Sequence, residues 1–323
     1  MCCATCLGNV ALLRLQAREG RAIALPPASP IYVAQRPVRS ESVKGIACMA
    51  LGMFLFSAGD MVAKLLTETV HPVQVVWSRQ LGLLLGVVVL LLMRGPGILR
   101  SANPGLQIGR GVLAVCSATL FIVAIGYVPL ADAVAVTFVA PFLVTVMGAL
   151  ILRERVGPRR WAAVAVGFFG MLIVIRPGMG VVHPAMLLIM AAAFFFAMRQ
   201  ILSRMLSGGD RVETTVAYTA ITSSLILTVP LPFFWQTPDM GRDLPLLIAV
   251  AVLAAGGEVL VIKSLELAQA VVLAPVHYTL LIWGTAYGWL IFGEFPDIWT
   301  WIGAAVIMGT GLYVVHRERL AKE

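Results

Sequence analysis

The sequence predicts an all-α membrane protein with ten transmembrane helices, arranged as two inverted repeats of five helices each. Three observations predict this fold class. Apolar residues make up 60% of the 323-residue chain and charged residues only 12%, and the mean hydropathy is +0.93. Ten apolar runs of about 20 residues follow one another along the chain. The second five runs repeat the first five at an offset of 140 residues.

A soluble domain carries about 25% charged residues, so this chain has too little charge to cover a water-facing surface. Each apolar run from Lys44 onward is long enough to cross a hydrocarbon core of about 30 Å as a helix that satisfies its own backbone. Pro141 and Pro275 fall in mid-span and are candidate helix kinks. The predicted spans are 44–66, 73–93, 104–125, 129–151, 158–176, 185–206, 212–233, 244–263, 270–293 and 297–316.

The chain divides into two tails and two repeats. Residues 1–43 contain scattered prolines and arginines without a sustained apolar run, so we expect a disordered cytoplasmic tail. Residues 44–180 form the predicted first repeat, with the first five helices, and residues 181–317 form the second. Residues 318–323 are a predicted C-terminal tail.

The positive charges indicate how the chain crosses the membrane. Cytoplasmic loops of membrane proteins carry an excess of Lys and Arg. With the N-terminus inside, the inner loops and C-terminal tail carry twelve of these residues and the outer loops carry three. Both termini are therefore predicted to be cytoplasmic. The net charge of +8 then reflects topology, and we expect no nucleic-acid partner.

The internal repeat is the most specific signal in the chain. Ten of the thirty positions that align residues 145–174 with residues 285–314 are identical, and one match joins Glu154 to Glu294. Because each repeat holds an odd number of spans, the second copy is inverted in the membrane. Inverted repeats are typical of secondary transporters, in which the two halves act as alternate gates around a midplane site. A duplication retained for packing alone is the alternative.

Some ionisable residues lie near the ends of the predicted spans. A charge inside the membrane costs at least about 2.5–3.5 kcal/mol unless it finds a partner, water or the headgroups. Lys64 and Asp132 lie within about a turn of a span end, and Arg110 can reach the inner headgroups with its long side chain. We expect these three residues to contact the membrane surface.

Four other charges lie deeper in the spans. Asp60 and Arg79 are predicted roughly 6–8 Å toward the outer side of the midplane, and Arg199 and Glu258 about as far toward the inner side. The hypothesis is that each pair borders a central cavity, where it anchors polar parts of a substrate or closes a gate. The alternative is that each pair is a static ion pair that locks helices together.

Aromatic and polar residues accompany these charges at similar depths. Flat rings with polar edges suit stacking on a planar ligand, while a few hydrogen-bond donors orient it. A lone histidine in an apolar span is also commonly a hydrogen-bonded interior residue. The candidate binding residues of this kind are Trp77, Gln200, Tyr218, His277, Tyr278 and Trp283.

The absence of other motifs argues against an enzyme. The sequence has no G-x-x-x-x-G-K-[ST] loop, which excludes an intrinsic ATPase, and no G-x-S-x-G or H-E-x-x-H motif. We therefore predict no catalytic residue, metal site or cofactor. A membrane-embedded enzyme is the alternative of another class, and it requires polar residues clustered at one interface.

Three features of the chain resemble EamA-type members of the drug/metabolite transporter superfamily. They are the segment 126–178, the glutamate that closes the fourth span (Glu154), and its counterpart in Phe292-Gly293-Glu294. The resemblance covers about residues 44–316. It implies ten helices in two inverted five-helix repeats and transport of a small metabolite across the bacterial inner membrane. The implied partners are the substrate and the lipid bilayer, and a homodimer stays an open alternative.

Within that superfamily, residues 71–80 and the following Arg94-Gly95-Pro96 resemble the bacterial riboflavin importers. The resemblance implies uptake of riboflavin, whose planar ring system would stack between aromatic side chains. Its ribityl hydroxyls would meet Asp60, Arg79 or Gln200. An amino acid or an S-adenosyl compound, whose charges would meet the two ionic pairs, is the alternative substrate.

Overall fold

A computed structural model of the chain describes residues 38–154, 156–176, 183–206, 209–268 and 270–320. The described residues from Arg39 onward belong to one compact unit. Residues 1–37, where we expected most of the disordered tail, and residues 321–323 lie outside the described part. The helices are α2 (Val38–Leu66), α3 (Pro72–Arg94), η1 (Pro96–Leu99), α4 (Pro104–Ile125), α5 (Leu130–Thr137), α6 (Ala140–Ile151), α7 (Pro158–Ile175), α8 (Ala185–Leu206), α9 (Val212–Thr228), α10 (Leu231–Phe234), α11 (Asp243–Leu267), α12 (Ala270–His277), α13 (Thr279–Phe292) and α14 (Ile298–Leu320).

The described chain is helical without strands, which confirms the all-α class. Seven helical segments are long and apolar enough to cross a membrane, and a shorter apolar stretch occupies Ile298–Val314. The remaining expected spans, 212–233 and 270–293, are each divided into two helices. The seven segments are Val43–Leu66, Pro72–Arg94, Pro104–Ile125, Leu130–Ile151, Pro158–Ile175, Ala185–Leu206 and Asp243–Leu267.

Two helix interruptions occur at equivalent positions of the repeat. The backbone between α5 and α6 breaks at Phe138, and the backbone between α12 and α13 breaks at Tyr278, which is 140 residues later. Phe138 N–H bonds to the carbonyl three residues earlier at 3.3 Å, and Tyr278 N–H does the same at 3.3 Å. Pro141 and Pro275 lie within three residues of these breaks, and proline removes a helical hydrogen bond. Both candidate kinks are therefore helix interruptions.

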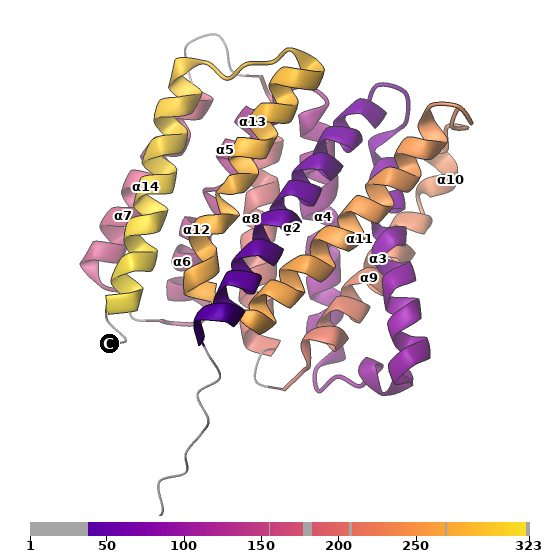
Figure 1. The fold of residues 1–323 in the computed structure, drawn as a ribbon, viewed down its shortest axis with the longest axis horizontal. Helices are drawn as coiled ribbons and strands as arrows, with labels where there is room; N and C mark the ends of the chain where they lie inside the picture. The colour runs from indigo at the N-terminus through magenta and orange to yellow at the C-terminus, as the bar shows by residue number, and fades with distance from the viewer. Residues whose placement is uncertain (1–37, 155, 177–182, 207–208, 269, 321–323) are drawn as a thin grey trace, which may run out of the picture. The chain divides into compact units, whose positions relative to one another are not determined.

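Helices from the two halves of the chain pack against each other. α4 lies along α8, α7 along α14 and α3 along α11, and Figure 1 shows α7 and α14 side by side. α3 and α11 approach so closely that a Cβ added to Gly82 would lie 2.1 Å from the carbonyl oxygen of Ala251. In lipid, small residues at such crossings let helices gain packing contacts that hydrophobicity alone does not drive.

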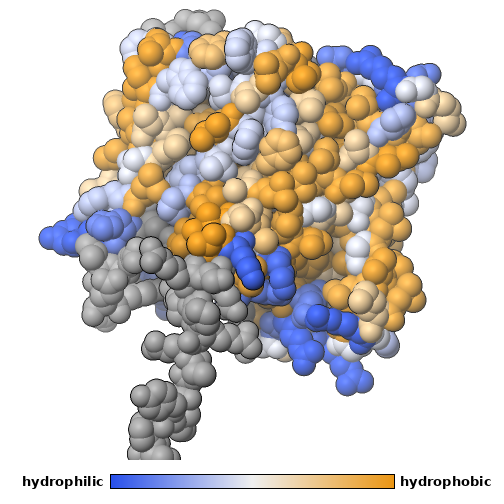
Figure 2. Space-filling view, viewed as in Figure 1, coloured by the Kyte–Doolittle hydropathy of each residue, from blue (hydrophilic) through white to orange (hydrophobic). Residues whose placement is uncertain are grey.

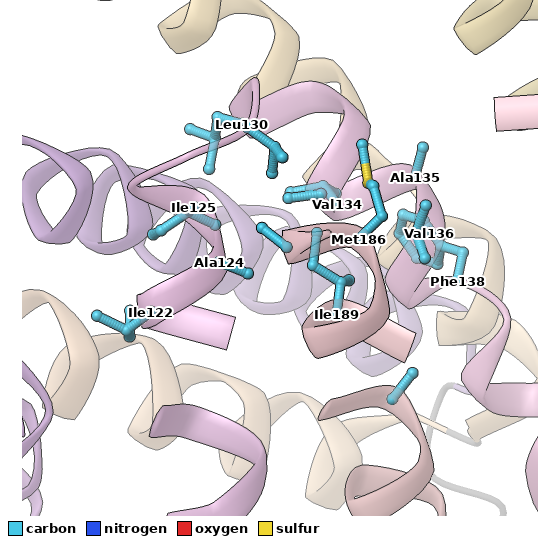
Figure 3. Packing of buried hydrophobic residues seen from close by; sticks show 14 of the residues in the cluster. Ile122, Ala124, Ile125, Leu130, Val134, Ala135, Val136, Phe138, Met186 and Ile189 are labelled. Atoms are coloured by element: carbon cyan, nitrogen blue, oxygen red, sulfur yellow. The ribbon is translucent and has the colours of Figure 1, made fainter. Parts of the chain in front are cut away.

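The core joins α4, α5 and α8 (Figure 3). Ile122 and Ile125 from α4, Leu130 from α5 and Ile189 from α8 have no measurable solvent exposure. Branched and small apolar side chains fill this region, so α8, which carries Arg199, is held by close packing.

The outside of the helices is also apolar. In Figure 2 hydrophobic residues cover the middle of the face over α3 and α11, and hydrophilic residues gather above and below them. Leu92 and Phe233 are exposed over 82% and 85% of their surfaces. A soluble monomer rarely exposes so much contiguous apolar area, which fits a surface covered by lipid.

Candidate functional site

An ion pair joins Asp60 on α2 to Arg79 on α3. Arg79 Nη1 donates a hydrogen bond to Asp60 Oδ1 at 2.8 Å, and both side chains are largely buried. The Arg79 guanidinium also lies over the ring of Phe56, 5.8 Å from its centroid, which adds a cation–π attraction. The two charges expected to pair therefore do so. Their role in gating or substrate binding stays a prediction.

Arg199 on α8 and Glu258 on α11 were expected to form the second pair. Among the described residues, neither side chain takes part in an ion pair or a side-chain hydrogen bond, and Arg199 Nε is buried without a partner. The Arg199 guanidinium lies over the ring of Phe196 at 4.7 Å. Glu258 and Arg79 act on it electrostatically from farther away. Phe196 follows Phe56 by 140 residues, so the two arginines lie over equivalent rings of the repeat.

Arg110 on α4 does not reach the membrane surface as we expected. Its Nε donates to Ser203 Oγ at 2.7 Å, and its Nη1 donates to Thr219 Oγ1 and, at 3.5 Å, to the Thr215 carbonyl. α4 packs against both α8 and α9, and these two helices supply the acceptors. The neutral partners hold Arg110 inside the protein, and Arg199 lies within its electrostatic reach.

Trp77 lies outside this charged group. Its Nε1 donates to Thr228 Oγ1 at 2.9 Å, and its ring meets Trp235 edge to face at 6.4 Å. It lines a groove of about 800 Å³ between α3 and α11 whose walls are almost entirely apolar. Leu85 and Val252 on these walls are exposed on the apolar outer face, so we assign the groove to lipid contact rather than to the substrate.

His277 and Tyr278 lie at the break between α12 and α13. Tyr278 is buried, with its ring 4.9 Å from Phe138, and the His277 ring meets the same phenylalanine edge to face at 6.1 Å. The His277 side chain is exposed to solvent. An exposed side chain is not the hydrogen-bonded interior residue that a lone histidine in an apolar span commonly is.

The other candidate binding residues occupy separate places. Trp283 on α13 meets Phe54 of α2 edge to face at 5.0 Å. Tyr218 on α9 donates its hydroxyl to the carbonyl of Leu99 at 3.1 Å, so it fastens η1 to α9 instead of facing the deep charges. Gln200 is half-buried on α8 beside Arg199. The structure thus groups the deep charges and separates Trp77 and Tyr218 from them.

A buried ion pair that sequence reasoning missed joins Lys64 to Glu294. Lys64 Nζ lies 2.6 Å from Glu294 Oε2 and donates to the Val128 carbonyl at 2.9 Å. Leu130 N–H donates to the same carboxylate at 3.4 Å. Lys64 is only 8% exposed, so it does not extend to the headgroups as we expected. The pair joins the end of α2 to the loop after α13.

The second half of the chain contains an equivalent pair. Arg204 Nη1 lies 3.2 Å from Glu154 Oε1, and both residues stand 140 positions from Lys64 and Glu294. Each glutamate follows a residue with positive φ, Arg153 at 54° and its counterpart Gly293 at 67°. Each glutamate N–H bonds a glycine carbonyl six residues earlier, at 3.1 and 3.0 Å. The sequence showed that the two glutamates occupy equivalent positions of the repeat. It did not show their partners as equivalent, because one is a lysine and the other an arginine.

Asp132 belongs to the end of the molecule that holds the Lys64 pair. It accepts a hydrogen bond from Thr300 Oγ1 at 2.8 Å. The same hydroxyl lies 3.0 Å from Asp297, which pairs with Arg176 at 2.5 Å. These contacts tie the starts of α5 and α14 to the end of α7, and no cation of the described residues contacts Asp132 directly.

Comparison with known proteins places this arrangement in a family. The model of the EamA-like transporter family matches residues 43–176 and again residues 183–316. The chain is similar to an S-adenosylmethionine uptake transporter of Rickettsia bellii, with 26% identity over 86% of this chain and 95% of that protein. It is also similar to a riboflavin transporter of Vibrio cholerae, with 32% identity over 72% of this chain and 79% of that protein.

A solved structure described as "Crystal structure of protein" has the same fold. It matches with a TM-score of 0.57 and 18% identity over 87% of this chain and 99% of that chain. The relatives are named as transporters, which points to transport rather than catalysis. The two family matches together cover most of the sequence, and the chain therefore belongs to the EamA-like transporter family, as a membrane transporter of small metabolites.

Proposed function

We propose that this protein is a secondary transporter of the bacterial inner membrane that works by alternating access, with ten spans in two inverted five-helix repeats. The observation that carries the proposal is the pair of equivalent ionic contacts, Lys64 with Glu294 and Arg204 with Glu154. Each contact joins the first helix of one repeat to the end of the fourth span of the other. Two gates of this kind are what an inverted duplication provides.

The two contacts lie at opposite membrane surfaces in the proposed topology. α2 runs outward and carries Lys64 in its last turn, whereas α8 runs inward and carries Arg204 in its last turn. The outer contact is largely shielded from solvent, while the inner side chains are exposed over 48% and 39% of their surfaces. This asymmetry supports an outer gate that is closed and an inner gate that a modest motion opens. Transport requires the two to exchange these states.

Riboflavin is the first candidate substrate, because the riboflavin transporter of Vibrio cholerae reaches 32% identity. The rings of Phe56 and Phe196 contact Arg79 and Arg199, and the ring of Trp283 packs against α2. Such rings suit a planar ligand. S-adenosylmethionine is the second candidate, because a relative named for its uptake aligns over 86% of the chain. The unpaired charges of Arg199 and Glu258 specifically favour this second candidate.

Counter-flow in proteoliposomes tests the proposal. Vesicles preloaded with unlabelled riboflavin or S-adenosylmethionine receive the labelled compound outside, and we expect transient accumulation of at least one label. An enzyme or receptor produces no such accumulation.

The gates are tested by replacing Lys64 and Glu294, or Arg204 and Glu154, with cysteine pairs in a variant without its native cysteines. Cross-linking either pair with a short bifunctional reagent, cleavable by reduction, should stop transport, and reduction should restore it. Full transport by either cross-linked protein would contradict the gate assignment.

A further inference from the structure

Two opposite charges remain unpaired inside the described helices. The Arg199 guanidinium has five N–H donors, none of which bonds a described residue, and its Nε is buried. Glu258 makes no hydrogen bond or ion pair with a described residue. A charge without a partner at membrane depth costs at least about 2.5–3.5 kcal/mol, so such groups mark places where water or a ligand binds.

The other deep charges have partners within the protein, so Arg199 and Glu258 differ from them. Asp60 and Arg79 neutralise each other at 2.8 Å. Arg110 has three oxygen acceptors from α8 and α9. If Arg199 and Glu258 served only to hold helices together, we would expect them to form a direct ion pair as well. Instead they attract each other across a gap wider than an ion pair.

The Arg199 guanidinium packs on an aromatic ring, while its buried Nε has no acceptor among the described residues. Phe196 covers the guanidinium at 4.7 Å. A guanidinium that contacts an aromatic ring keeps its N–H donors, which bind a carboxylate through two parallel hydrogen bonds. The positive charge of Arg110 acts on the same place. The side of the gap formed by α8 thus favours an anion, and the side formed by Glu258 on α11 favours a cation.

We propose that Arg199 and Glu258 bind the carboxylate and the ammonium group of an α-amino-acid moiety in the transported substrate. The two groups of an α-amino acid are attached to one carbon, so a single small moiety neutralises both side chains. This inference rests on the transporter function proposed above and names its substrate class. It favours amino acids and their conjugates, such as S-adenosylmethionine, over riboflavin, which carries neither charge at neutral pH.

Equilibrium binding to the purified full-length protein tests the inference separately from transport. The probes are S-adenosylmethionine, its decarboxylated analogue, methionine and riboflavin. We expect an amino-acid-bearing probe to bind and its decarboxylated form to bind at least tenfold more weakly. Arg199→Gln should lower the affinity for S-adenosylmethionine about tenfold to a hundredfold, as expected for a lost charge-assisted contact. It should leave the affinity for the decarboxylated analogue nearly unchanged.

Glu258→Gln should weaken S-adenosylmethionine and its decarboxylated analogue alike, because both keep the ammonium group. Arg199→Lys, which retains the charge without the two parallel donors, should fall between wild type and Arg199→Gln. Lys263→Gln and Glu266→Gln remove the exposed i,i+3 pair on α11 and serve as controls with unchanged affinity. Size-exclusion profiles and thermal unfolding verify that each variant is folded.

The outcomes separate this inference from the proposed function. Binding of riboflavin but of neither amino-acid probe would overturn the inference and leave the transporter intact. Equal losses for S-adenosylmethionine and its decarboxylated analogue in Arg199→Gln would also overturn it, as would the absence of binding by all four probes. Failure of counter-flow despite specific binding of S-adenosylmethionine would overturn the transport proposal. The binding roles of Arg199 and Glu258 would then stand.

Discussion

Replacing Lys64 with methionine removes the buried cation of the Lys64–Glu294 pair while keeping an apolar side chain of similar length. Of the described contacts to the Glu294 carboxylate, the long hydrogen bond from Leu130 N–H then remains, and the Val128 carbonyl loses a donor. The matched variant is Arg204→Met, which breaks the equivalent pair of the other repeat. Both variants remove one positive charge, so their difference reports burial rather than net charge.

The magnitude follows from the exposure of the two pairs. Breaking a buried ion pair costs about 3–5 kcal/mol because it leaves a charge uncompensated. The Lys64 side chain is 9% exposed and that of Glu294 31%, so we expect the lower end of this range, about 3 kcal/mol. Arg204 and Glu154 are exposed over 48% and 39%, and such surface pairs contribute about 0–1 kcal/mol.

Thermal unfolding in detergent, followed by tryptophan fluorescence, measures the difference. Lys64→Met should lower the midpoint at least threefold more than Arg204→Met. The double variant Lys64→Met/Glu294→Leu should recover much of the loss, because an apolar pair often replaces a buried ion pair without cost. Equal shifts for Lys64→Met and Arg204→Met would refute the reasoning, and so would a double variant no more stable than the single one.

Further predictions concern packing, charge and topology. Gly82→Ala should lower the midpoint of thermal unfolding by several degrees, because its Cβ would meet the α11 backbone at 2.1 Å, whereas Gly86→Ala, with open space around it, should not. Arg79→Gln should lower transport by protein that still reaches the membrane, and unchanged uptake would exclude the outer-end role of the Asp60–Arg79 pair. Hydrogen bonds from Ser101, Ala102 N–H and Gln107 hold the pKa of the Asp210 carboxyl below its usual 3.8. These hydrogen bonds therefore stabilise the folded protein above pH 3.8, and the stabilisation is lost as pH falls through the lower pKa of the folded state. Asp210→Asn should remove this acid sensitivity, which melting curves between about pH 3 and 7 measure. Reporter fusions at the C-terminus should be active only with cytoplasmic reporters, and a periplasmic phosphatase signal would reverse the assigned topology.

The helices were largely predictable from the sequence. α4 and α8 occupy residues 104–125 and 185–206, which are the predicted spans. A helix in lipid must be about 20 apolar residues long and satisfy its own backbone, so its position is encoded locally. The divided spans at Phe138 and Tyr278 were less predictable, because proline marks a kink without specifying where the helix breaks.

The candidate site was predictable only in part. The sequence identified Asp60, Arg79, Arg199 and Glu258 as deep charges, because a charged residue in an apolar run is visible without a structure. It placed Trp77 with them, yet this side chain turns to the groove between α3 and α11. Depth along a helix follows from residue number, but the direction of a side chain around the axis depends on how the helices rotate against each other.

The sequence by itself determined the membrane class, the positions of most helices and the duplication that relates the two halves. Only the tertiary structure decided which charges meet. Lys64 pairs with Glu294, 230 residues later in the chain, and Asp60 pairs with Arg79, whereas Arg199 and Glu258 form no direct ion pair. The physical reason is range: hydrophobic transfer acts on each segment independently, but an ion pair requires two side chains within a few ångströms, and only the packing of all the helices sets that distance.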